Sequence, residues 1–65
     1  MDRTYDLFEV VGGDVMWRSA IVGHENAIRA LQQLAKRTTN EVRLMHLASH
    51  SLVASTNVPP KPEIT

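Results

Sequence analysis

Cysteine is absent from the 65-residue sequence. The chain therefore forms neither a disulfide nor a thiolate metal site. A fold of this length buries only about 60% of the surface that its unfolded chain exposes, so small domains usually need a further source of stability. Because 43% of the residues are hydrophobic, association with a second chain is the source that we expect.

An excess of charge of either sign is also lacking, since seven basic residues balance seven acidic ones. A neutral chain has no field that draws it to nucleic acid or to an anionic membrane. No run approaches the roughly 20 apolar residues of a membrane span, and the first residues contain no stretch typical of a signal peptide. We therefore expect a cytoplasmic protein without a membrane partner.

What the sequence does contain is a β-hairpin pattern in its first third. Residues 5–11 and 15–22 are rich in β-forming side chains, and Gly12 and Gly13 between them suit a two-residue turn. With these glycines at its centre, the turn places Phe8 opposite Trp17.

The alternation of side chains along this hairpin defines two faces. Glu9 and Arg18 share one face as diagonal neighbours that can pair in solvent. We therefore expect the other face, with its aromatic pair, to meet the helix. This inward face consists of Phe8, Val10, Val15, Trp17 and Ile21.

Residues 24–37 have the clearest helical period of the chain. Glu25 at the start and Lys36 and Arg37 at the end complement the helix dipole, and Asn40 is expected as a left-handed cap after the helix. The apolar arc of about 120° predicts one buried stripe. Its members are His24, Ala27, Ile28, Leu31, Leu34, Ala35 and Thr38.

Residues 41–48 and 51–56 read as a second hairpin around a turn at Ser49 and His50. Neither face of this hairpin is clearly polar, so two inward sets remain open. One contains Val42, Leu44 and Val53, and the other contains Met45, Leu47 and Leu52.

The predicted fold class is α+β, with the order β-β-α-β-β. It consists of a four-stranded antiparallel sheet with one amphipathic helix packed on one face. Residues 1–56 form the single domain. Residues 57–65 contain three prolines and are expected to be a disordered tail.

One helix leaves the second face of such a sheet uncovered, and soluble monomers rarely expose a large apolar patch. We expect this face to bind a second copy of the chain as a dimer, through a two-fold face or by pairing of edge strands, or to bind another protein. The candidate interface residues are Tyr5, Leu7, Val11, Met16 and Val22.

Catalytic and metal sites have little support. His46 and His50 are four residues apart, but they lie at a strand end and a turn, where this spacing does not fix a metal geometry. His24 beside Glu25 fits a role in packing better than acid–base catalysis. No nucleophile elbow or phosphate-binding loop is present. We expect a non-enzymatic protein with no cofactor and no metal.

Nucleic-acid binding is the alternative function. Residues 27–48 hold four basic side chains and one acidic side chain, so a local basic surface exists despite the neutral total. The candidate contacts are Arg29, Lys36, Arg37 and Arg43.

The runs YDLFEV, LAKRTTNE and MHLAS, with WR in the second strand, together span most of the expected domain. In these runs the sequence resembles a group of short bacterial proteins of unknown function. The resemblance implies a bacterial origin. It implies no activity, ligand or partner.

Overall fold

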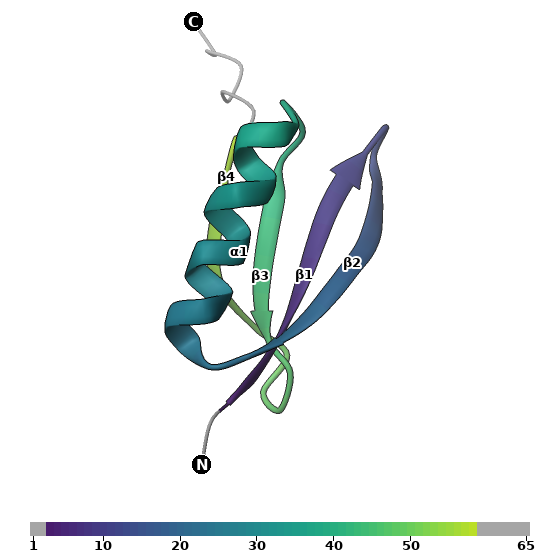
Figure 1. Ribbon diagram of the computed structural model, residues 1–65. Helices are drawn as coiled ribbons and strands as arrows, with labels where there is room; N and C mark the ends of the chain where they lie inside the picture. Colours follow the sequence, from purple (N-terminus) through teal and green to yellow (C-terminus); the bar gives the residue numbers. More distant parts are fainter. Residues whose placement is uncertain (1–2, 59–65) are drawn as a thin grey trace, which may run out of the picture.

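The computed structural model describes residues 3–58, which form four strands and one helix in the order β-β-α-β-β (Figure 1). The sheet is antiparallel with the strand order β2-β1-β3-β4, and α1 packs against it. The predicted α+β fold is confirmed. The elements are β1 (Thr4–Val11), β2 (Asp14–Val22), α1 (His24–Arg37), β3 (Val42–His46) and β4 (Ser51–Thr56).

The first hairpin turns at the predicted glycines. Gly12 and Gly13 have φ values of +58° and +88°, the left-handed region that a tight hairpin turn requires and that glycine adopts without strain. Phe8 pairs with Trp17 and Val10 pairs with Val15, as the sequence predicts.

A β-bulge then changes the register of β2. Phe8 pairs with Trp17, but the preceding residue Leu7 pairs with Ser19, so Arg18 is an extra residue in β2. A shift of one residue moves each later side chain to the other face. Ile21 therefore pairs with Tyr5 and joins the face of Tyr5 and Leu7.

The hydrophobic core lies between α1 and the face of β1 and β3 that α1 covers. Its buried members are Tyr5, Leu7, Ala27, Leu31, Val42 and Leu44. The prediction that Phe8, Val10, Val15 and Trp17 face the helix is wrong, because β1 turns Tyr5, Leu7 and Glu9 inward instead. Ile21 is the exception, since the bulge brings it against the core.

The second hairpin differs from the prediction in its turn. Residues 47–50 form the turn, so β3 ends at His46, which pairs with Ser51. Val53 is an extra residue here, because Leu44 pairs with Ala54 while Met45 pairs with Leu52. Of the two inward sets left open by the sequence, the side of β3 with Val42 and Leu44 is the buried one.

The helix begins and ends at the predicted residues, but its C-terminal connection is built differently. Thr38 caps α1 in an extended conformation, and among residues 3–58 the non-glycine residues with positive φ are His50 and Asn57. The prediction of Asn40 as a left-handed cap is therefore wrong. Its side chain instead donates a hydrogen bond to Glu9.

Candidate functional site

The side of the sheet opposite α1 is named the open face. By strand register it contains side chains of all four strands, since directly paired residues share a face. From β2 to β4 these are Val15, Trp17, Ala20 and Val22, then Thr4, Asp6, Phe8 and Val10, then Arg43 and Met45, then Leu52 and Ser55.

Large apolar side chains of the open face are exposed on both edge strands. On β2 the exposed fractions are 50% for Val15, 57% for Trp17 and 55% for Val22, and on β4 Leu52 is 55% exposed. Phe8 and Met45 lie between these edges and are half-buried. An apolar patch that crosses a whole sheet is typical of an interaction site rather than of isolated surface residues.

Trp17 is held on the open face by a hydrogen bond to the neighbouring strand. Its indole Nε1 donates to Oδ1 of Asp6 at 3.1 Å. This bond satisfies the one polar atom of the ring within the chain, so the rest of the exposed indole needs no water. Trp17 is thus an oriented apolar anchor, a type of residue that often dominates binding energy at interfaces.

The open face also carries one charge of each sign on its central strands. Asp6 lies on β1 and Arg43 on β3, where Asp6 pairs with Met45 and Phe8 pairs with Arg43. Arg43 Nε donates to the carboxylate of Glu41, and this hydrogen bond, with the negative charge of Glu41, raises the pKa of Arg43. Two carboxylates, Asp6 and Glu41, therefore stand beside one guanidinium at the centre of the open face.

On the covered side, Glu9 joins three separate segments. Its carboxylate accepts hydrogen bonds from Thr38 Oγ1 at 2.7 Å, from Asn40 Nδ2 at 2.8 Å and from Arg18 Nε at 3.0 Å. The hydrogen bonds from Asn40, Thr38 and Arg18 lower the pKa of Glu9. The expected Glu9–Arg18 pair forms, but at the margin of the core, with Glu9 only 7% exposed.

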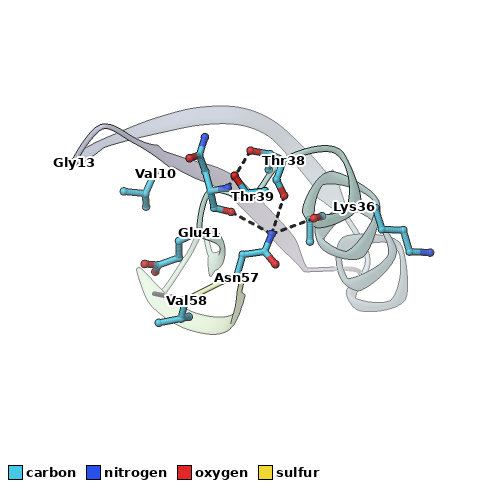
Figure 2. Close-up of a pocket in the computed structure, with 10 residues that line it drawn as sticks. Val10, Gly13, Lys36, Thr38, Thr39, Glu41, Asn57 and Val58 are labelled. Atoms are coloured by element: carbon cyan, nitrogen blue, oxygen red, sulfur yellow. Dashed lines mark hydrogen bonds between the residues drawn. The ribbon is translucent and has the colours of Figure 1, made fainter. Parts of the chain in front are cut away.

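A pocket of about 700 Å³ lies where α1 ends, and Figure 2 shows the Asn57 amide directed toward the end of the helix. The Asn57 Nδ2 amide donates to the carbonyl oxygens of Ala35 at 3.0 Å, Thr38 at 3.0 Å and Asn40 at 3.3 Å. This amide supplies a partner to the carbonyl of Ala35, in the last turn of α1, and to the carbonyls of Thr38 and Asn40 in the connection that follows the helix. These hydrogen bonds connect the end of β4 to the end of α1, so the residues around the pocket have a structural role. Asn57 itself was assigned to the tail from the sequence. Residues 59–65 of that expected tail lie outside the described residues.

Substitutions of Asn57 test this connection. Asn57→Gly keeps the φ of +57° accessible and removes the amide, so we expect a loss of about 1 kcal/mol in unfolding free energy. Asn57→Asp also tolerates this conformation but turns a carboxylate toward three carbonyl oxygens, so we expect a larger loss. Urea unfolding followed by circular dichroism measures both. An aspartate variant as stable as the wild type would contradict the role of the amide.

The histidines have structural contacts. The rings of His24 and His46 lie 5.8 Å and 5.5 Å from the ring of Tyr5, and His46 Nδ1 is 2.8 Å from Ser49 Oγ. His50 lies in the turn before β4 with a φ of +53°. Within residues 3–58, no three histidine or carboxylate side chains are grouped as ligands of one metal ion.

The candidate interface residues do not form one surface. Tyr5 and Leu7 are only 3% and 4% exposed and belong to the core, so their predicted place on the uncovered face is wrong. Val11 and Met16 lie on the covered side by register but are 40% and 44% exposed, near the tip of the hairpin that Figure 1 shows standing to the side of α1. Val22 alone lies on the open face.

The candidate nucleic-acid contacts are also divided. Arg29, Lys36 and Arg37 are exposed on α1, whereas Arg43 lies on the open face, on the other side of the sheet. The structure therefore does not bring the four together as one basic surface. Sequence reasoning instead missed Trp17 and Asp6, whose contact spans 11 residues and depends on the hairpin register.

Comparisons with protein-family models, with curated proteins and with solved structures found no match for this chain. In the described part of the chain, no helix is long and apolar enough to cross a membrane.

Proposed function

We propose that this chain is a non-enzymatic association domain that forms a homodimer through its open face. The observation that carries the proposal is Trp17, which is 57% exposed although its indole N–H is already bonded to Asp6. An exposed ring of this kind gains most when a second apolar surface covers it.

The size of the open face is consistent with a dimer of modest affinity. Strands about 4.8 Å apart and residues about 3.3 Å long give a four-stranded face an area of roughly 400 Å². Two such faces bury roughly 800 Å² in total, which is below the about 1,200–2,000 Å² of stable specific complexes. We therefore expect weak self-association that is lost on dilution.

The charges favour a second copy over nucleic acid as the occupant. Asp6 and Arg43 give the centre of the face both signs, so a second copy can present the opposite charge to each. A phosphate backbone would meet Asp6 and Glu41 as well as Arg43. The face is therefore better suited to a second copy than to a phosphate backbone.

A pair of valine substitutions tests the proposal. Val15 on the open face and Val58 outside the sheet are 50% and 57% exposed, so glutamate at either position replaces a similar side chain. We expect Val15→Glu to weaken self-association about tenfold or more, because each dimer would bury two new charges. Leu52→Glu, on the opposite edge strand, is expected to act alike, and Val58→Glu is expected to leave association unchanged.

Sedimentation velocity over a range of concentrations up to millimolar measures the association of each variant. Circular dichroism spectra of the variants report whether the fold is kept. A wild-type chain that stays monomeric throughout, or a Val58→Glu variant as weakened as Val15→Glu, would overturn the proposal. If the wild-type chain stays monomeric, the open face would instead be expected to bind a different protein.

A further inference from the structure

Both edge strands of the sheet are interrupted by a bulge. Arg18 is the extra residue in β2 and Val53 is the extra residue in β4, and these strands are the two outer ones in the order β2-β1-β3-β4. A bulge leaves a residue out of the ladder and twists the edge, which opposes pairing with a strand of another chain. The geometry therefore favours contact between faces over continuation of the sheet.

The open face is uneven from one edge to the other. Trp17 stands on β2, whereas Ser55 occupies the corresponding row on β4, because Trp17 pairs with Phe8, Phe8 with Arg43 and Arg43 with Ser55. In the next row, Ala20 on β2 corresponds to Leu52 on β4. These two rows, the ones that cross all four strands, thus each have a large side chain at one edge and a small one at the other.

Such a pattern is complementary to itself under one particular rotation. Consider a two-fold axis that runs parallel to the strands, between β1 and β3. It places β2 of one copy over β4 of the other. Positions along the strand direction do not change, so each row lies over the same row of the second copy. Trp17 of one copy then lies over Ser55 of the other, and Leu52 of one copy lies over Ala20 of the other. Large side chains meet small ones, as close packing of two sheets requires.

The central strands fit the same rotation. It places β1 over β3 of the second copy, so the ring of Phe8 meets the guanidinium of Arg43, and Asp6 lies one row from that cation. An arginine over an aromatic ring is a favourable contact. A two-fold axis across the strands would instead set β2 on β2 and bring the two Trp17 edges together.

We infer that two copies pack face to face about a two-fold axis parallel to the strands, with Trp17 of each copy seated on β4 of the other. This inference rests on the proposed homodimer and specifies its geometry. It excludes both edge-to-edge pairing and a dimer in which identical strands lie on each other.

Cysteine cross-linking tests this geometry cleanly because the chain has no cysteine of its own. Ala20→Cys marks β2 and Ser55→Cys marks β4, and both are small substitutions on the open face. We expect a short bis-maleimide to give several-fold more cross-linked dimer from a mixture of the two variants than from either alone. Gln32→Cys, exposed on α1, serves as the control and is expected to give only background.

The possible outcomes separate this inference from the proposed function. Cross-linking of Ala20→Cys with itself, above the level of the mixture, would place β2 on β2 and overturn the geometry while the homodimer stands. Background cross-linking from the mixture, with self-association that Val15→Glu still weakens, would also overturn it. A wild-type chain that is monomeric by sedimentation would remove both the function and its geometry.

Discussion

Leu44→Ala is expected to leave much of the protein unfolded at room temperature. Leu44 is fully buried in β3, where it pairs with Leu7 on one side and Ala54 on the other beneath α1. Truncation of a buried leucine costs about 2–5 kcal/mol, because the apolar contacts are lost and a cavity remains. A single core of this size rarely supplies more than about 3–5 kcal/mol, so this one substitution is comparable with the whole stability.

Urea unfolding followed by circular dichroism measures the effect, at concentrations where association is weak. Leu52→Ala is the matched control, because Leu52 is 55% exposed on the open face of the adjacent strand. We expect this control to cost less than about 1 kcal/mol in unfolding free energy. Equal midpoints for the two alanine variants would show that α1 does not pack on the side of β3 that carries Leu44.

If Leu44→Ala does not fold, a graded series keeps the test decisive. Leu44→Val removes less volume and is expected to cost about 1 kcal/mol, enough to lower the urea midpoint of a protein that still folds. A Leu44→Val variant with the wild-type midpoint would contradict the central position of this side chain.

The elements of the fold were predictable because their signals are local. The bounds of α1 follow from apolar spacing between His24 and Arg37, and the first turn follows from two adjacent glycines. The order β-β-α-β-β then leaves little choice but a four-stranded sheet with one covered face. None of these inferences depends on which side chains meet across the sheet.

The choice of the covered face was not predictable, because it depends on a bulge and on a buried carboxylate. One extra residue at Arg18 reverses the faces of the second half of β2, and no local signal marks it. Glu9 was taken as evidence of a solvent face, yet Arg18, Thr38 and Asn40 compensate its burial. Two of these three partners lie about 30 residues away in the sequence.

The candidate site shifted with the covered face. The expectation that one side of the sheet is left without a helix is confirmed, but Trp17 was predicted for the core and instead stands on the exposed side. The sheet therefore has an uncovered apolar face as predicted, but different residues form it. Association through this face stays a prediction. Asn57 was missed for a different reason, since hydrogen bonds from a side chain to distant carbonyls leave no pattern in the sequence.

Glu9 makes the stability of the fold depend on pH. Hydrogen bonds from Asn40, Thr38 and Arg18 lower its pKa in the folded state below that of the unfolded chain, about 4.3. A group with a lowered folded pKa contributes its full stabilisation above the unfolded value, and this contribution is lost as the pH falls through the folded value. We therefore expect the contribution of Glu9 to be complete at neutral pH, to begin to fall near about pH 4 and to be lost as the pH drops through the lowered folded pKa.

Glu9→Gln isolates this contribution, because glutamine keeps the shape of the side chain but cannot ionise and turns an amide toward the same donors. Urea unfolding at about pH 7 and about pH 3 should give a wild type that is clearly more stable than Glu9→Gln at the higher pH and much closer to it at the lower. Glu25→Gln, exposed in the first turn of α1, controls for loss of any carboxylate and should show little of this change. A difference in unfolding free energy between wild type and Glu9→Gln that is the same at both pH values would contradict this role of the charge. The shape and the hydrogen bonds of the side chain would then hold the hairpin to the end of the helix.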